Sequence, residues 1–374
     1  MKIVAAFFLV FLNAFELAAQ EQPAFVFNEG RLDSLLRHSY DDSLPGVSIA
    51  ILHQEKTIFK RSYGTSNIAT KSRLTDSSNF NICSLTKQFT AVAILQLEQK
   101  HLLSLNDKLS KFFPAMNKKV ADVITIQQLL SHTSGIQDHY SFTNTTNMKH
   151  AHDSDVYNAI KNVDSTYFTP GTKFRYSNTA YCLLAVIIEK VSGISYNEYL
   201  AKNIFEPAGM KNTIVWNENA SIKNEVTAYE QDSLNNLVRS GPQEHIFFST
   251  EGDGGIYTCI DDYIKWFRAL QSGKTFSISI VDKARSIQFM IDLHKKVGYG
   301  FGWFIDEQDP QRKVYHSGDN GGFRTYTFSI PTLDYLIVIF SNRNDINIEQ
   351  IVQQIVNMQF PSLKNFVPVE ILTS

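Results

Sequence analysis

The chain has 374 residues, long enough for one large hydrophobic core or for two subdomains that share an interface. Hydrophobic residues make up 43% and charged residues 19%, the composition of an ordinary globular protein. The formal net charge is -2 and the pI is about 6.6, so the charge balance gives no electrostatic sign of a partner such as nucleic acid or an anionic membrane.

The first twenty residues have the outline of a secretory signal peptide. Lys2 precedes the apolar run Ile3 to Leu12, and a pair of small alanines follows. A membrane anchor is the alternative, but Asn13 and Glu16 end the run short of the roughly 20 residues that a spanning helix needs. We therefore expect residues 1–20 to be cleaved, a periplasmic or secreted protein, and no stable membrane insertion after signal cleavage.

The next part of the chain predicts a helix followed by antiparallel strands. Apolar residues at helical spacing predict a helix over Arg31 to His38, and the apolar run Gly46 to His53 predicts a strand. A hairpin tip near Gln54-Glu55-Lys56 leads to a returning strand over Thr57 to Tyr63. From Ser84 onward the apolar period changes to 3.6, which predicts a helix.

The rest of the chain predicts helices and polar loops up to about His294, and strands after that. Helical signals lie at residues 126–130, 178–191 and 261–270. Strand signals lie at residues 299–305, 313–316, 325–330 and 335–340, and a closing helix follows at 347–359.

Together these elements predict an α/β (α+β) fold. An antiparallel sheet takes strands from both ends of the chain, is flanked by N- and C-terminal helices, and has a mostly helical subdomain inserted into it. We expect one domain over residues 21–374, with the α/β part at about 27–80 and 295–360 and the helical part at about 81–294. An odd count of three cysteines leaves at least one free thiol, so disulfides do not form the framework.

The tetrad Ser84-Leu85-Thr86-Lys87 is the only place where a lysine follows a serine by three positions. On one helix face such a pair can act as nucleophile and base without a histidine. Lys87 is a base only when neutral, so its pKa must fall by roughly 2 to 3 units through burial and the helix N-terminus. The same helix start leaves the Ser84 N–H free as half of an oxyanion hole. Taken alone, the tetrad also fits an N-capping serine and a solvated lysine.

Two further elements make the chemical interpretation stronger. Tyr176-Ser177-Asn178 is the only Tyr-x-Asn in the chain and lies on a loop before a helix. The tyrosine hydroxyl can relay a proton, and the asparagine amide can hold Lys87 and bind a substrate carbonyl. His316-Ser317-Gly318, the only His-x-Gly, ends a candidate strand beside the bend Gly321-Gly322-Phe323. A lone histidine is more often structural, but here the other two elements favour a site.

In this order the three elements resemble the serine β-lactamase and penicillin-binding-protein superfamily, in the branch of class C β-lactamases, D-aminopeptidases and related esterases. The resemblance covers most of the mature chain. It is supported by the stretches Leu129-Leu130-Ser131-His132-Thr133-Ser134-Gly135, Pro170-Gly171, Phe174-Arg175-Tyr176-Ser177-Asn178, Gly254-Gly255-Ile256-Tyr257 with Asp261-Asp262, and Tyr299-Gly300-Phe301-Gly302-Trp303.

The resemblance implies a role for each matching residue. Ser84 is the acylated nucleophile, Lys87 and Tyr176 share the acid and base work, and Asn178 contacts the amide side chain of the substrate. The second oxyanion donor is the backbone N–H of Asp319, opposite that of Ser84.

The third element departs from the Lys-Thr-Gly that true β-lactamases and DD-peptidases usually carry. His316 takes the place of that lysine, and Ser317 and Gly318 complete the expected substrate-binding residues. Lys274-Thr275 is followed by Phe276 and does not supply the motif. Because His316 is at most partly charged near neutral pH, a strongly held substrate carboxylate is less assured. The resemblance therefore implies acyl-enzyme chemistry more strongly than penicillin hydrolysis.

We expect a serine hydrolase that acts through an acyl-enzyme on an amide, peptide or ester bond. Its partners are a small-molecule, peptide or ester substrate and no nucleic acid, and the protein is a monomer. The alternative is a penicillin-recognising binding module or sensor that does not turn over. An adhesive or structural protein would leave the coincidence of three elements unexplained.

The sequence predicts no metal and no cofactor. His150-Ala151-His152-Asp153, with Asp155 beyond, is the best candidate for zinc, but histidines in a polar loop are usually solvated. No cysteine or second group of ligands near this segment supports a metal.

Overall fold

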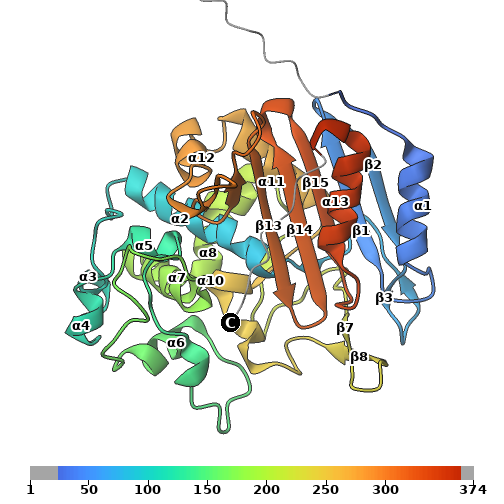
Figure 1. Cartoon of the computed structure of the whole chain (residues 1–374). Coiled ribbons are helices and arrows are strands. Elements are labelled where there is room, and N and C mark those ends of the chain that lie inside the picture. Colours follow the sequence, from blue (N-terminus) through green and yellow to red (C-terminus); the bar gives the residue numbers. More distant parts are fainter. Residues whose placement is uncertain (1–23, 364–374) are drawn as a thin grey trace, which may run out of the picture.

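The computed structural model describes residues 24–363, so the predicted signal peptide at residues 1–20 lies outside the described residues. An eight-stranded antiparallel sheet in the order β10-β11-β12-β13-β14-β15-β1-β2 forms the centre. Its strands are β1 Val47–His53, β2 Lys56–Tyr63, β10 Phe289–Asp292, β11 Val297–Tyr299, β12 Phe304–Asp306, β13 Lys313–Asn320, β14 Phe323–Ile330 and β15 Tyr335–Ser341. Strands from both ends of the chain thus lie side by side, as predicted (Figure 1).

The central strands of this sheet are buried on both faces, and β1 shows why. Ile49 and Ile51 contribute to a hydrophobic cluster with α1 Glu29–Ser39 and α13 Ile348–Gln359, which cover one face (Figure 1). Ala50 and Leu52, which alternate with them, contribute to the larger cluster with the helical part. The predicted fold class, with terminal helices on the sheet and an inserted helical subdomain, is confirmed.

The helical part is built around α2 Thr86–Gln99, in which nearly every residue is buried. The other helices are α3 Leu109–Phe112, α4 Lys118–Ala121, α5 Ile126–Leu130, α6 Asp153–Ile160, α7 Asn178–Ser192, α8 Tyr196–Leu200, α9 Glu206–Ala208, α10 Glu251–Gly254, α11 Ile260–Ser272 and α12 Ile278–Ala284. Short strands complete the fold: β3 Thr65–Asn67, β4 Ser72–Arg73, β5 Phe80–Asn81, β6 Ile214–Val215, β7 Ala228–Gln231, β8 Leu237–Ser240 and β9 Ile256–Thr258.

Two predicted strands have different bounds in the structure. The single strand predicted over residues 299–305 is wrong, because this segment contains two paired strands, β11 and β12, separated by a tight turn. In the turn, Gly302 has a φ of 87° and the Gly300 N–H donates to the Trp303 carbonyl oxygen. Glycine adopts this φ without steric strain. The strand predicted over residues 313–316 continues to Asn320, so the third sequence element lies inside β13.

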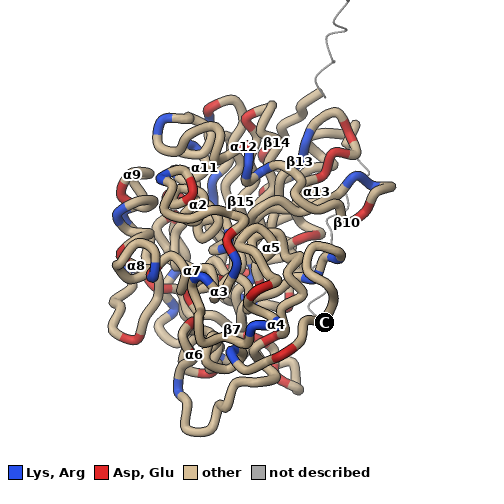
Figure 2. Tube along the Cα trace, turned by 90° about the vertical axis from the view of Figure 1, so that its left-hand side faces the viewer, with Lys and Arg blue, Asp and Glu red and all other residues tan. Residues whose placement is uncertain are grey.

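Acidic and basic residues are interspersed along the face of the molecule in Figure 2, in keeping with the small net charge. In the part of the chain that the structure describes, no single helix combines the length and apolar composition needed to cross a bilayer. The pair formed by residues 178–192 and 196–208, bent by 77°, satisfies these criteria only jointly.

Candidate active site

Ser84 lies in a single 3₁₀ turn, η1 Cys83–Leu85, directly before α2. The helix predicted to begin at Ser84 therefore starts as 3₁₀ and becomes α-helical at Thr86. Cys83 has a φ of 52°, a left-handed conformation that costs a non-glycine residue about 1–3 kcal/mol and clusters at functional sites. Its N–H donates to Asn81 Oδ1 at 2.8 Å, which holds this turn. The Ser84 N–H, in the first turn, has no acceptor within the helix.

Lys87 is fully buried and touches three polar groups. Its Nζ lies 2.9 Å from Ser84 Oγ, 2.9 Å from Asn178 Oδ1 and 2.8 Å from the backbone oxygen of Asp253. Burial lowers the pKa of Lys87 to about 8, although the nearby Asp253 opposes the shift. This direction is the one that the sequence predicted, whereas the contribution of Asp253 was not foreseen.

Tyr176 packs over the amino group of Lys87, with Nζ 4.9 Å from the centre of the ring. Its hydroxyl is buried and forms no hydrogen bond with the described residues. Burial raises the pKa of this hydroxyl and outweighs the neighbouring Ser84 hydroxyl, which lowers it. Tyr176 therefore keeps its proton at neutral pH. Buried polar groups without a partner are rare and often belong to a functional site.

Asn178 is the first residue of α7, and Ser177 caps that helix by accepting a hydrogen bond from the Ala180 N–H at 3.2 Å. The two ends of the Asn178 amide have different partners. Oδ1 accepts from Lys87, and Nδ2 donates to the hydroxyl of Tyr140 at 3.0 Å. Tyr140 was not predicted as a site residue, because no sequence pattern links it to Asn178.

The third element lies on an open edge of β13. Strand β12 pairs with β13 only as far as Tyr315, so beyond it that edge carries no further strand among the described residues. The β13–β14 turn is Gly321-Gly322, and Gly321 has a φ of 53°, which suits a two-residue hairpin. Asn320 flanks the turn and directs its backbone N–H at β14. Hydrogen-bonded and non-hydrogen-bonded pairs alternate along an antiparallel ladder. The backbone N–H of the preceding residue, Asp319, therefore points away from β14, to the open edge.

Gly318 brings this edge against the segment that carries the nucleophile. A Cβ at Gly318 would lie 2.3 Å from Thr325 Oγ1 and 2.8 Å from both the Cys83 Cβ and the Ile82 carbonyl oxygen, closer than real Cβ atoms approach other atoms. Ser84 and Asp319 each follow this contact by one residue.

The side chain of His316 is fully buried and engaged at both ring nitrogens. Nδ1 lies 2.6 Å from the Ser317 carbonyl oxygen, and Nε2 lies 3.1 Å from the hydroxyl of Tyr299. Burial, assisted by the charge of Lys87, lowers the pKa of His316 to about 3. His316 is therefore neutral at physiological pH and presents no exposed cation.

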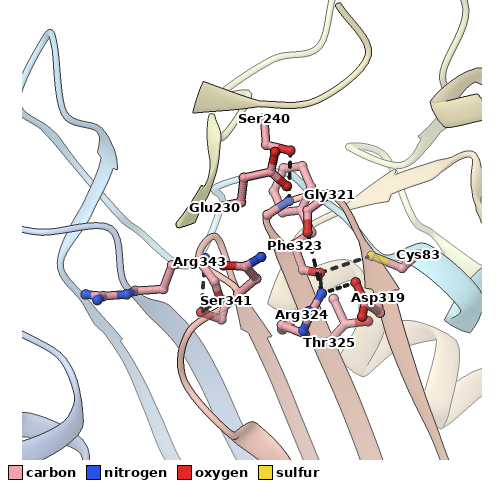
Figure 3. A network of polar contacts seen from close by, with 12 residues as sticks. Cys83, Glu230, Ser240, Asp319, Gly321, Phe323, Arg324, Thr325, Ser341 and Arg343 are labelled. Atoms are coloured by element: carbon pink, nitrogen blue, oxygen red, sulfur yellow. Dashed lines mark hydrogen bonds and ion pairs between the residues drawn. The ribbon is translucent and has the colours of Figure 1, made fainter. Parts of the chain in front are cut away.

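A cation on the neighbouring strand β14, Arg324, is already paired. Arg324 forms an ion pair with Asp319 across the hairpin and donates to the carbonyl oxygens of Gly321 and Phe323 (Figure 3). The Cys83 sulfur contacts the same Phe323 oxygen at 3.8 Å. Burial raises the pKa of Cys83 to about 12, so this thiol is structural at neutral pH.

One group of side chains among the described residues has the donor atoms of a metal site. Asp153, Cys182 and Asp253 are buried, and their ligand atoms lie within 4.8 Å of one another. Burial raises the pKa of Asp153 and of Cys182, which favours protonated forms that bind metals poorly. His152, weighed as a zinc ligand from the sequence, instead lies 2.8 Å from Glu218.

Comparison with known proteins finds relatives over most of the chain. A family model described as Beta-lactamase matches residues 32–351. Penicillin-binding protein 4* of Bacillus subtilis (strain 168) is 32% identical over 302 residues, which are 77% of this chain and 66% of that protein.

Solved structures share the fold. The octameric penicillin-binding protein homologue of Pyrococcus abyssi has a TM-score of 0.79 at 26% identity, with 90% of this chain and 79% of that chain covered. A D-stereospecific amidohydrolase of Streptomyces has a TM-score of 0.72 at 20% identity, with 90% and 99% covered. At this lower identity the likeness concerns the fold alone.

Proposed function

The chain belongs to the beta-lactamase family, and on that premise we propose that it is an exported serine hydrolase that cleaves an amide, peptide or ester bond through an acyl-enzyme on Ser84. The family match confirms the superfamily predicted from the sequence. Proteins with this fold include hydrolases such as the amidohydrolase of Streptomyces. The contacts of Lys87 are the observation that carries the proposal.

Neutral Lys87 has two N–H groups and one lone pair. Asn178 Oδ1 and the Asp253 carbonyl oxygen are acceptors, so they take the two N–H groups. The lone pair is left for the hydroxyl of Ser84, 2.9 Å away. In this orientation Lys87 accepts the Ser84 proton as Oγ attacks the substrate carbonyl carbon.

Acylation then proceeds with each proton accounted for. The Oγ–C bond of the tetrahedral intermediate forms while its oxyanion accepts hydrogen bonds from the N–H groups of Ser84 and Asp319. Tyr176 gives its proton to the leaving amine or alcohol as the bond from carbon to that group breaks, and it recovers a proton from the Lys87 ammonium. Water attacks the acyl-enzyme with the same groups in reverse roles, and Ser84 regains its proton as the acid leaves.

Tyr176 suits this relay because its raised pKa keeps the proton on the hydroxyl until a leaving group needs it. Its hydroxyl lacks a partner among the described residues, and a substrate heteroatom would provide one.

The second candidate is a sensor that is acylated and does not turn over. The family includes penicillin-binding proteins such as that of Bacillus subtilis, which is the observation in its favour. Single-turnover kinetics separate the two: a Ser84 adduct that lasts hours with every ester and amide would support the sensor and contradict the hydrolase.

Replacement of Ser84 by alanine is the direct test. Ser84→Ala should abolish hydrolysis of p-nitrophenyl esters, D-aminoacyl amides, muropeptides or nitrocefin, whichever the wild type cleaves, and labelling by a fluorophosphonate or penicillin probe. Ser154→Ala, at an exposed position of α6, is the matched control and should retain both. Activity that survives Ser84→Ala would overturn the assignment.

Export and a monomeric state belong to the same proposal, and each has its own test. N-terminal sequencing of the secreted or periplasmic protein should find a start close to residue 21. Size-exclusion chromatography with light scattering should give the mass of one chain.

A further inference from the structure

A buried chain of hydrogen bonds connects the second sequence element to the third and takes no part in the proton transfers described above. The N–H of Ser177 donates to His132 Nδ1 at 3.1 Å. The Tyr299 hydroxyl lies 3.2 Å from His132 Nε2 and 3.1 Å from His316 Nε2. The other nitrogen of His316 lies 2.6 Å from the Ser317 carbonyl oxygen. His132, Tyr299 and His316 are all fully buried.

The two ends of this chain assign its protons. A backbone N–H only donates, so His132 Nδ1 accepts and the neutral ring carries its proton on Nε2. A backbone carbonyl only accepts, so His316 carries its proton on Nδ1 and accepts at Nε2. The Tyr299 hydroxyl therefore accepts from His132 and donates to His316. Burial lowers the pKa of both imidazoles, that of His316 to about 3, which keeps both rings neutral.

We propose that Tyr299 is a positioning residue of the active site: its hydroxyl bridges His132 Nε2 and His316 Nε2 and thereby couples the loop that carries Tyr176 and Asn178 to strand β13. The inference rests on the proposed function, because it assigns Tyr299 a role in arranging that site. Tyr299 contacts neither Ser84 nor Lys87 through any hydrogen bond of the described residues, so its action is indirect.

Ring packing supports the coupling on the side of the loop. The centroids of the His132 and Tyr176 rings are 4.2 Å apart, so a rotation of His132 would move the surface on which Tyr176 rests. The rings of His132 and Tyr299 are 4.7 Å apart, and those of Tyr299 and His316 are 6.0 Å apart. These ring contacts thus form a continuous series from Tyr176, the proposed proton relay, to His316 on β13.

Coupling of these two segments matters for the proposed chemistry. The loop supplies the proton-transfer group Tyr176, whereas β13 supplies the oxyanion donor Asp319. Both must be placed correctly around one tetrahedral carbon, and a misplacement of about 1 Å can cost on the order of 100-fold in rate. A buried network in which every member is satisfied has one arrangement, which fixes this placement.

Tyr299→Phe tests the proposal because it removes one oxygen atom and keeps the ring. With the ester or amide that the wild type cleaves, kcat should fall by roughly 10- to 100-fold, and KM should change by less than about threefold. The reason is that an interaction that only positions groups acts mainly on the chemical step. Tyr326→Phe is the matched control. Tyr326 is also buried in the sheet, but its hydroxyl has no partner among the described residues, so kcat should stay at the wild-type value.

Nitrogen NMR of the histidine side chains tests the assignment independently of activity. Wild-type protein should show His132 protonated at Nε2 and His316 at Nδ1, with His316→Gln used to assign its signals. In Tyr299→Phe, whose folding is checked by its melting temperature, His316 should keep its proton on Nδ1, while its Nε2 signal should shift because that nitrogen loses the hydrogen bond from Tyr299. Wild-type kcat in Tyr299→Phe, an equal loss in Tyr326→Phe, or the opposite tautomers in wild type would each overturn the proposal. An inactive wild type that shows the assigned tautomers would instead contradict the proposed function and leave the hydrogen-bond chain supported.

Discussion

The amino group of Lys87 lies 2.8 Å from the backbone oxygen of Asp253, a residue 166 positions later in the chain. Together with Asn178 Oδ1, this oxygen takes the two N–H groups of the neutral amine and directs its lone pair at Ser84. In the proposed mechanism, these two acceptors allow a serine and a lysine one helical turn apart to act as nucleophile and base. The acceptors come from α10 and α7, which pack against α2 in the fold.

The pH profile of hydrolysis should report the pKa of Lys87. Its protonated form cannot accept the Ser84 proton, and burial lowers its pKa to about 8. We therefore expect kcat/KM to rise with pH, tenfold per unit at low pH, and to level off above about pH 8. Lys87→Arg should be inactive throughout, because arginine stays protonated. A profile that is flat from pH 6 to pH 10, or that levels off near the ordinary pKa of histidine, would contradict Lys87 as the base.

Tyr176→Phe should separate catalysis from stability. The loss of the proton relay should lower kcat by about 100- to 10,000-fold. The same change removes a buried hydroxyl that lacks a partner among the described residues, so the melting temperature should stay equal or rise. Calorimetry and steady-state kinetics on one preparation measure both. Reduced activity together with a clearly lowered melting temperature would favour a structural role for the hydroxyl.

Two variants at Asp319 should distinguish the contribution of its backbone N–H to activity from that of its side chain. Asp319→Ala keeps the N–H and loses only the exposed ion pair with Arg324, so activity should remain within a few-fold of wild type. Asp319→Pro removes the N–H, and because that group points to the open edge of β13 the sheet should survive. We expect kcat to fall by about 100- to 1,000-fold, as for the loss of one oxyanion donor. Equal activity of the two variants would exclude this donor.

His316→Ala should affect all substrates alike. A greater loss for substrates with a carboxylate would be expected if His316, which takes the place of a lysine, held that group. In the structure His316 is buried and its pKa falls to about 3, so it offers no charge to such a group. Matched pairs of ester substrates with and without a carboxylate should therefore lose kcat/KM by the same factor. A selective loss for the charged member would show that His316 is a recognition residue after all.

Gly318→Ala should destabilise the protein and impair the site together. The added Cβ would press on Thr325 and on the Cys83 segment, and such overpacking costs about 1–3 kcal/mol of the free energy of unfolding. Gly30→Ala in α1 is the control. Its Cβ would meet only Asn28 Oδ1 at 3.7 Å, so stability should be unchanged or higher by up to about 1 kcal/mol. Urea unfolding compares the two, and a Gly318→Ala protein as stable as wild type would refute the close contact.

Much of the fold could be predicted because its elements carry local patterns. Helix α5 agrees with its predicted bounds, and the predicted helix over 178–191 differs from α7 by one residue. The β11–β12 turn was missed, because Phe301 and Trp303 continue an apolar run through a bend that only the φ of Gly302 reveals. Patterns of hydrophobicity record which residues are buried, and they do not record where the backbone reverses within a buried run.

The sequence by itself determined which reactive residue types are present and how they are spaced along the chain. These are the serine and lysine one helical turn apart, the Tyr-x-Asn at the start of α7, and the His-x-Gly on β13. Tertiary structure alone decided their state. The low pKa of Lys87 and the neutrality of His316 follow from burial, and the partners Asp253, Tyr140 and Tyr299 come from distant segments. Protonation depends on desolvation and on neighbours in space, which a linear sequence does not contain.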